Sequence, residues 1–278
     1  MPIRPDTIVS RLIWIFRRFA LYLVAALIFG TPISARSQEV PRSLIEDLVT
    51  ANHILAKQGI ADSFGHVSVR HPTIPDHFLI SQAKAPARVT ADDIVEFDLD
   101  GNPINGNGRQ FYSERFIHAE IYRARKDVNA VIHSHSPTMI PFGVTNIPLR
   151  SIVNTAAFLA SGAPVFDLRK THGMTNLLVT DPGRGKALAA VLGNYAVALM
   201  RGHGVTVVAA NVRRAVIRAV YAELNAKLLW QALTMNSPIT YLSPEEGAIQ
   251  EAYFDEAGPG HATDRFWENL KSDMPAGQ

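Results

Sequence analysis

The sequence predicts an α/β protein in which a central β-sheet is flanked by helices. Short apolar runs with strand-like alternation are interspersed with segments whose apolar residues recur at helical intervals. One of these segments is a long amphipathic helix expected over 212–235. No internal repeat, low-complexity tract or Pro/Ser-rich linker divides the chain after residue 37. We therefore expect a single domain over 38–278, built in three layers around one sheet.

The first 37 residues differ from the rest of the chain. Four arginines (4, 11, 17 and 18) precede the compact apolar run FALYLVAALIFG (19–30), and small residues follow it in TPISARS. This order is typical of a secretory signal peptide. A membrane anchor is the alternative, but the apolar run is short for crossing a bilayer. We predict a signal peptide over 1–37, cleaved near Ala35 to Ser37, and a mature protein that is exported to the periplasm and not attached to a membrane.

The charge balance changes when this segment is set aside. Residues 1–37 contain five arginines and one aspartate, so the net charge of +2 for the whole chain becomes −2 for the remainder. A folded domain of this charge lacks the basic face that nucleic-acid binding requires, and we expect no nucleic-acid partner. The chain contains no cysteine, which excludes disulfides and thiolate chemistry.

The first half of the domain begins with a helix over 41–59, where apolar residues are spaced helically and Gly59 closes the run. GHVSVR (65–70) and HFLIS (77–81) are predicted strands joined by a turn. IVEFDLDGNPI (94–104) alternates around a DGN turn signal and predicts a hairpin.

A helix over 113–127 is expected next, with Ser113 as its N-cap and Glu114 as its first residue. NAVIHSHS (129–136) is the following strand. TNLLVTD (175–181), a helix over 183–193 and the apolar segment 194–210 then continue a strand–helix–strand order.

Asn211 is predicted to cap the long helix over 212–235. Its expected apolar stripe consists of Ala215, Ile217, Val220, Leu224, Leu228 and Leu229.

Four residues are candidates for a metal site. His133 and His135 are two positions apart on a predicted strand, so their side chains project from the same face. His203 lies between Gly202 and Gly204 at the head of another apolar run, and Glu114 lies at a helix start. Three imidazoles and one carboxylate suit zinc or a similar divalent ion. On spacing alone, the histidines can equally be polar residues at a strand end, and Glu114 a simple capping charge.

The motifs GHVSVR (65–70), SERFIH (113–118), HSHS (133–136) and GHG (202–204) occur in an order and at a spacing that resemble the class II aldolase/adducin family. The resemblance extends from about residue 43 to about 250 and implies a class II aldolase-like fold. It also implies that His133, His135 and His203 bind one divalent ion per chain. Glu114 is implied as the fourth ligand or as a displaced catalytic base. In the family, the ion chelates a hydroxy-carbonyl unit and stabilises an enediolate, with zinc expected first and manganese or cobalt as alternatives.

The sequence departs from the sugar-phosphate aldolases of this family where those enzymes bind phosphate. His66 replaces an asparagine, Ala83-Lys84 stands near a Thr-Gly position, and Tyr112-Ser113 replaces a Ser-Ser pair. An imidazole and an ammonium suit a carboxylate, so His66, Ser68, Lys84 and Ser113 are the predicted substrate-binding residues. A solvated loop lysine at position 84 and a structural histidine at position 66 are the alternatives.

Further segments, including KAPARVTADDIVEFDLDGNP (84–103) and YLSPEE (241–246), are similar to a branch that decarboxylates hydroxylated aromatic or ring-cleavage acids. The tyrosine that family aldolases use to protonate the leaving fragment is missing from IPLRSIVNTAAF (147–158). The resemblance therefore implies a metal-dependent lyase that decarboxylates a small hydroxylated carboxylic acid, through an enediolate or enolate. An aldolase or epimerase of a non-phosphorylated sugar acid is the alternative, followed by a non-catalytic adducin-like module. The resemblance also implies a homotetramer.

Overall fold

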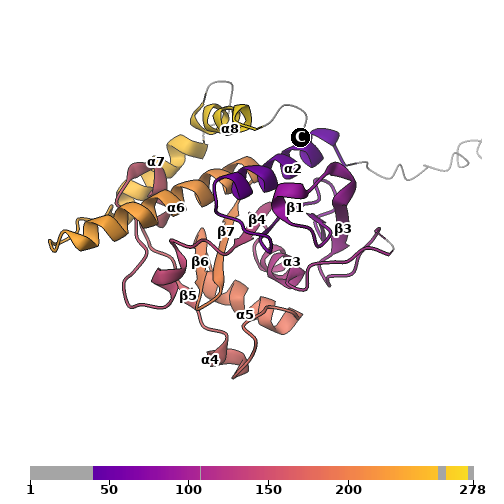
Figure 1. Ribbon diagram of the computed structural model, residues 1–278, viewed down its shortest axis with the longest axis horizontal. Coiled ribbons are helices and arrows are strands. Elements are labelled where there is room, and N and C mark those ends of the chain that lie inside the picture. Colours follow the sequence, from indigo (N-terminus) through magenta and orange to yellow (C-terminus); the bar gives the residue numbers. More distant parts are fainter. Residues whose placement is uncertain (1–39, 107, 256–260, 275–278) are drawn as a thin grey trace, which may run out of the picture. The chain divides into compact units, whose positions relative to one another are not determined.

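The computed structural model describes residues 40–106, 108–255 and 261–274 (Figure 1). The predicted signal peptide lies outside these residues. None of the helices in the described ranges is long and apolar enough to cross a bilayer.

The described residues form one mixed sheet of seven strands in the order β3-β2-β1-β4-β7-β6-β5. All neighbouring strands are antiparallel except β5 and β6, which are parallel. The strands are β1 (His66–Arg70), β2 (His77–Ser81), β3 (Ile94–Asp98), β4 (Ala130–Ser134), β5 (Val165–Phe166), β6 (Val197–Met200) and β7 (Gly204–Ala209).

Helices cover both faces of this sheet, which confirms the predicted α/β class. The helices are α2 (Arg42–Lys57), α3 (Arg115–Ala124), α4 (Arg169–His172), α5 (Pro182–Leu192), α6 (Val212–Thr234), α7 (Pro244–Asp255) and α8 (Ala262–Ser272). Short 3₁₀ helices are η1 (Pro86–Arg88), η2 (Ala91–Asp93), η3 (Ile140–Gly143) and η4 (Asn154–Leu159).

The alternation of side chains along each strand produces two apolar cores, one on each face of the sheet. On β4, Ile132 packs into the core shared with α2, α6 and α8. Its neighbour Val131 packs into the core shared with α3 and α5. In Figure 1, α2 runs beside the long α6, whereas α3 and α5 lie on the other side of the strands. His133 follows the same alternation as Val131, so it faces the α3 layer.

Helix α6 begins as predicted. The Asn211 side chain accepts a hydrogen bond from the backbone N–H of Arg214 at 2.8 Å, which caps the first turn. The predicted apolar stripe is wrong at Leu224, which is 40% exposed. Its neighbours Glu223 and Asn225 are buried instead because each has polar partners, Thr138 among those of Glu223 and the backbone of Ile152 among those of Asn225.

Two predicted elements before α6 are corrected by the structure. The predicted strand 175–181 is an irregular loop, in which Leu177 has a φ of 66°. A strand cannot accommodate this left-handed conformation. The side chains of Thr175 and Asn176 accept hydrogen bonds from the backbone of Leu177 and Leu178, so the loop satisfies its polar groups locally.

The predicted hairpin over 94–104 is also shorter than expected. Strand β3 ends at Asp98, and the returning chain makes a single bridge between Phe97 and Pro103. The Asp98 carboxylate accepts from the backbone N–H groups of Asp100 and Asn102, which closes a tight turn in place of further strand pairing.

Candidate metal centre

The four predicted ligands come from three elements that the sheet brings together. His133 lies on β4 and is paired in register with Thr206 of β7 and with His66 of β1. His135 follows the end of β4, and His203 lies in the turn between β6 and β7. Glu114 occupies the N-cap position of α3.

Glu114 is not the first residue inside α3, and Ser113 is not its N-cap, contrary to the sequence prediction. The helix begins at Arg115, and Glu114 makes no capping bond with its side chain. Glu114 Oε1 instead accepts a hydrogen bond from the backbone N–H of Val179 at 2.8 Å. This contact fixes the carboxylate toward the histidines rather than along the helix.

The side chains converge closely enough to share one ion. One ring nitrogen from each of His133, His135 and His203 lies within 4.8 Å of the others, and the ring centroids are 4.9 to 5.2 Å apart. Glu114 Oε2 lies 3.4 Å from His203 Nε2 and 3.8 Å from His133 Nε2.

Most ring nitrogens of this cluster lack a hydrogen-bond partner within the described residues. Within the described residues, both ring nitrogens of His133 and His203 and the Nε2 of His135 are buried without a partner. Buried polar atoms are almost always hydrogen-bonded, so several orphaned nitrogens in one place require an explanation. Three imidazoles and one carboxylate form a donor set that suits a divalent ion, so the residues fit a metal.

The protonation states agree with this fit. Burial by itself raises the pKa of Glu114. The His203 and His133 side chains and the Val179 N–H outweigh burial and bring the pKa of Glu114 to about 2. Burial holds the pKa of His133 well below its usual range, although Glu114 opposes the effect. Neutral imidazoles and an ionised carboxylate are the forms that ligate metals.

Neighbouring residues hold the ligands in place. Asp62 Oδ2 lies 3.1 Å from Nδ1 of His135, which directs the other nitrogen of that ring toward the cluster. A side chain at Gly204 would collide with the backbone oxygen of Ser134 and would lie 3.0 Å from His135 Cδ2. Glycine at position 204 therefore permits the close approach of β7 to the end of β4.

A cavity of about 550 Å³ opens beside the cluster. It is lined by Phe64, His66, Tyr112, Ser113, Glu114, His135, Asn176, Leu177, Leu178, Gly202 and His203. Two of the predicted substrate-binding residues, His66 and Ser113, therefore reach the cavity. Aromatic and aliphatic side chains supply most of its remaining walls.

The other two predicted substrate-binding residues have protein partners. Ser68 is fully buried and hydrogen-bonds His118 and Tyr122. Lys84 Nζ donates to Asp93 at 2.5 Å, and neither Ser68 nor Lys84 lines the cavity. A direct substrate contact for these two residues stays a prediction.

The sequence reasoning missed several residues of the site. Asp62 lies outside every motif, and no pattern links it to His135. Leu177 and Leu178 were assigned to a strand, although they line the cavity from a loop. Tyr112 is held by hydrogen bonds with the backbone of Lys84, and its ring centroid lies 4.5 Å from that of His66. The sequence did mark Tyr112, because Tyr112-Ser113 replaces a phosphate-binding Ser-Ser pair of the family, but Tyr112 was not among the predicted substrate-binding residues.

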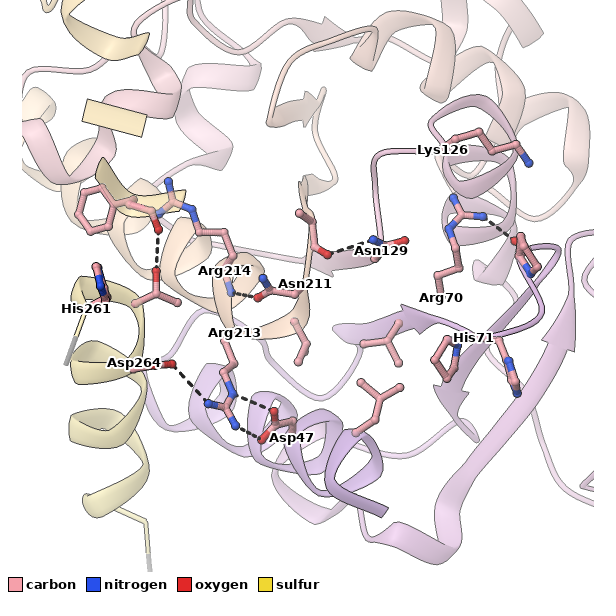
Figure 2. Close-up of a pocket in the computed structure, with 18 residues that line it drawn as sticks. Asp47, Arg70, His71, Lys126, Asn129, Asn211, Arg213, Arg214, His261 and Asp264 are labelled. Atoms are coloured by element: carbon pink, nitrogen blue, oxygen red, sulfur yellow. Dashed lines mark hydrogen bonds and ion pairs between the residues drawn. The ribbon is translucent and has the colours of Figure 1, made fainter. Parts of the chain in front are cut away.

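A second, larger cavity of about 920 Å³ lies at the N-terminus of α6, against α2, α8 and the end of β1 (Figure 2). Arg213 pairs with Asp47 at 2.8 Å and lies 3.6 Å from Asp264. The guanidinium of Arg70 donates to backbone carbonyls, including those of Val128 and Tyr122. The charges of this cavity are therefore largely matched by protein groups.

Comparisons with known proteins agree with this geometry. Residues 46–230 match the family model described as the class II aldolase and adducin N-terminal domain. The chain is similar to decarboxylase tropJ of Talaromyces stipitatus, with 34% identity over 71% of this chain and 80% of the relative. It is also similar to a 3,4-dihydroxyphthalate decarboxylase of Arthrobacter keyseri, with 30% identity over 73% of this chain and 84% of the relative. In fold, it resembles the L-fuculose 1-phosphate aldolase of Glaciozyma antarctica, with a TM-score of 0.67 and 21% identity over 90% of this chain and 96% of that one.

Proposed function

Since the chain belongs to the class II aldolase and adducin family and is an enzyme of the lyase class, we propose that it is a divalent-metal-dependent decarboxylase. Its substrate is a small hydroxylated carboxylic acid, either aromatic or derived from ring cleavage. The observation that carries the proposal is the set of buried, unpartnered imidazole nitrogens of His133, His135 and His203 beside Glu114. The two relatives named as decarboxylases support the choice of reaction.

His133, His135 and His203 hold the ion, with Glu114 as the fourth ligand or as a base when substrate displaces it. A bound divalent ion supplies Lewis acidity, which polarises a substrate oxygen and makes the adjacent carbon–carbon bond easier to break. Zinc is the first expectation for this ligand set, and manganese or cobalt are the alternatives.

Glu114 is suited to accept a proton during the reaction. Its carboxylate is ionised at neutral pH because its pKa is about 2. Oε1 is held by Val179, whereas Oε2 faces the histidines and the cavity, where a substrate hydroxyl can reach it. As carbon dioxide leaves, the electron pair of the broken bond stays on the substrate carbon, and that carbon takes up the proton that Glu114 accepted.

The remaining walls position a flat acid. Phe64, Tyr112 and Leu177 provide apolar surface for a ring, and Ser113 and His66 provide polar atoms at its edge. A cavity of about 550 Å³ has the size expected for a small-molecule site. No step in this scheme requires a phosphate-binding residue.

The test is carbon dioxide release from purified protein loaded with zinc, manganese or cobalt. The panel contains 3,4-dihydroxyphthalate, which is named for one relative, and simpler hydroxybenzoates and ring-cleavage dicarboxylates. We expect stoichiometric carbon dioxide and the matching decarboxylated product from at least one acid. An aldehyde or an epimer from a sugar acid, with no carbon dioxide from any member of the panel, would contradict the proposal.

The proposal includes export and assembly. The segment 1–37 has the composition of a signal peptide, and we propose a periplasmic homotetramer. N-terminal sequencing of the protein recovered from the periplasm tests the cleavage near Ala35 to Ser37. Light scattering tests the tetramer, and a monomeric mass at assay concentrations would contradict it.

A further inference from the structure

A chain of hydrogen bonds leads from His66 away from the metal centre and into the layer between β1 and α3. His66 Nδ1 lies 2.6 Å from His118 Nε2, and His118 Nδ1 lies 2.6 Å from Ser68 Oγ. Ser68 Oγ lies 2.7 Å from the hydroxyl of Tyr122. All four residues are almost fully buried, at 1% exposure or less. The proposed reaction uses His66 but assigns no role to His118, Ser68 or Tyr122.

The proton order along the chain follows from the number of protons available. Each hydroxyl and each neutral imidazole donates one hydrogen bond, and within the described residues the Ser68 hydroxyl has His118 and Tyr122 as its partners. When Ser68 and His118 both place their proton in one of these bonds, all three bonds run in the same direction. If they ran from His66 toward Tyr122, the Tyr122 hydroxyl would need a further acceptor. The partner that the structure gives this oxygen, within the described residues, is Ser68 Oγ, which in this direction is itself the donor.

The opposite direction satisfies Tyr122, Ser68 and His118, and leaves the last proton on Nε2 of His66, a residue that lines the cavity. Tyr122 donates to Ser68, Ser68 donates to His118 Nδ1, and His118 Nε2 donates to His66 Nδ1. A phenol is also a stronger proton donor than an alcohol, which favours the Tyr122 hydroxyl as the start of the chain. Burial raises the pKa of the Tyr122 hydroxyl well above its usual range, so it stays protonated, and the guanidinium of Arg70, 4.8 Å from the ring centroid, opposes that rise only in part.

We infer that the Tyr122–Ser68–His118 chain fixes the proton of His66 on Nε2, which makes His66 a neutral hydrogen-bond donor to the substrate and excludes it from the metal. The position of the proton on His66 follows from the hydrogen-bond geometry alone, whereas the role of His66 as a donor to substrate rests on the proposed function. Tyr122, Ser68 and His118 act through His66, so they are positioning residues.

The exclusion resolves an ambiguity in the metal centre. By distance alone, His66, Glu114 and His133 form a second group of atoms that can hold an ion. A ligating nitrogen must offer a lone pair. With a proton on Nε2 and a hydrogen bond accepted at Nδ1, His66 has none to offer. The ion is therefore confined to His133, His135, His203 and Glu114.

The same proton position defines what His66 recognises. A donor at the edge of a mostly apolar cavity pairs best with a group that only accepts, and a charged acceptor gives the stronger bond. A carboxylate meets both conditions, and an amine meets neither. His66 therefore selects acids in which a carboxylate lies at the ring edge that reaches Nε2.

The test is the imidazole ¹⁵N–¹H correlation spectrum of the zinc-loaded protein labelled with ¹⁵N-histidine. The His66 signals are assigned by their loss in His66→Asn. We expect a protonated Nε2 and an unprotonated Nδ1, without substrate present. A proton on Nδ1, or the signature of a zinc-bound nitrogen, would overturn the inference. The wild-type protein decides the question, so no variant has to fold for the test to succeed.

Two variants sharpen the result. Tyr122→Phe removes the first donor of the hydrogen-bond chain, so the His66 proton should no longer prefer Nε2 over Nδ1. If about half of the molecules then carry the proton on Nε2, KM should rise about twofold. Tyr221→Phe is the matched control, because it removes a hydroxyl from a half-buried tyrosine of α6 that packs on Phe266. An unchanged His66 spectrum in Tyr122→Phe would refute the positioning role, and Ser68→Ala serves if that variant does not fold.

Metal content separates this inference from the proposed function. His66→Asn should bind the same amount of zinc per chain as wild type, and a loss of zinc would overturn the exclusion of His66. If no acid in the panel is decarboxylated, the proposed reaction fails while the tautomer measurement remains valid.

Discussion

The cavity at the N-terminus of α6 and the cavity beside the histidine cluster differ both in size and in chemistry. The cavity at the N-terminus of α6, drawn in Figure 2, has a volume of about 920 Å³. The cavity beside the histidine cluster has a volume of about 550 Å³. The larger one is rich in charge, but Arg213 pairs with Asp47, and Arg70 donates to backbone carbonyls. The smaller one contains the unpartnered nitrogens of His133 and His203.

This difference shows that unsatisfied polar atoms locate a site better than volume does. At the larger cavity, the ion pair of Arg213 with Asp47 and the carbonyl partners of Arg70 contribute to folding and leave these two guanidiniums with little need of a ligand. Buried nitrogens without partners lower stability unless something binds them. A ligand bound at the smaller cavity should therefore stabilise the protein more than one bound at the larger cavity. Substitutions at the two cavities test this difference.

The largest effect is expected for His133→Ala. Removing this ligand should lower turnover by about 10³-fold or more, because polarisation by a bound ion is worth several kcal/mol in the transition state. Carbon dioxide release and metal content are measured together. Ser134→Ala, at the next position on β4, is the matched control and should retain both. A His133→Ala protein that is folded and fully active would show that the cluster is not the catalytic site.

Asp62→Asn tests the support of His135. The substitution keeps an oxygen for the backbone N–H groups of Phe64 and Gly65 but removes the charge that orients the ring. Loss of such a partner should weaken zinc affinity or activity by about 10- to 100-fold. Competition with a zinc chelator measures the affinity. Equal affinity in the variant and wild type would mean that Asp62 does not orient His135.

Asp93→Asn tests a paired cluster close to the site. Although burial raises the pKa of Asp93, hydrogen bonds from Lys84, Gln82 and Thr90 lower it well below its usual range. Removing the charge should cost about 1–3 kcal/mol in the free energy of unfolding, while metal content is unchanged.

The pH dependence of this effect has a fixed sign. A depressed pKa stabilises the folded state above the unfolded-state pKa of aspartate, about 3.9, and that contribution is lost as pH falls through the folded-state pKa. The difference between wild type and Asp93→Asn in denaturant unfolding should therefore be full at neutral pH and shrink below about pH 4. A difference that grows as pH falls would contradict this account.

The smallest effect is expected for Arg213→Gln at the larger cavity. The Arg213 side chain is 36% exposed, and such ion pairs are worth about 0.2–1 kcal/mol. Turnover should stay within experimental error of wild type, since no catalytic group is nearby. A large loss of activity in a folded Arg213→Gln protein would give the larger cavity a function that its pairing does not suggest.

The sequence was informative where local chemistry decides the structure. Asn211 caps α6 as predicted, and the strand predicted over 129–136 is present as β4 (Ala130–Ser134), although it ends before His135. The four predicted ligands also meet in space, because β4 lies between β1 and β7 in the sheet.

The sequence predictions that were wrong concern positions whose structure depends on groups far away in the sequence or on side-chain hydrogen bonds. Glu114 was expected to be the first residue of a helix capped by Ser113, but it occupies the N-cap position itself, and the backbone of Val179, 65 residues away, holds its carboxylate. The run TNLLV has the composition of a strand, yet Thr175 and Asn176 satisfy the backbone locally and allow the left-handed Leu177. Leu224 is exposed because its buried polar neighbours found partners on other segments. None of these contacts leaves a periodic signal in the sequence.

The most direct test of the central claim is the metal content of the purified protein, measured as divalent ions per chain by elemental analysis. The structure predicts close to one zinc, manganese or cobalt ion per chain in the wild type and in Arg213→Gln, and almost none in His133→Ala. Absence of bound metal from the wild type, even after reconstitution with each ion and removal of the excess, would contradict the assignment of the unpartnered histidines to a metal centre.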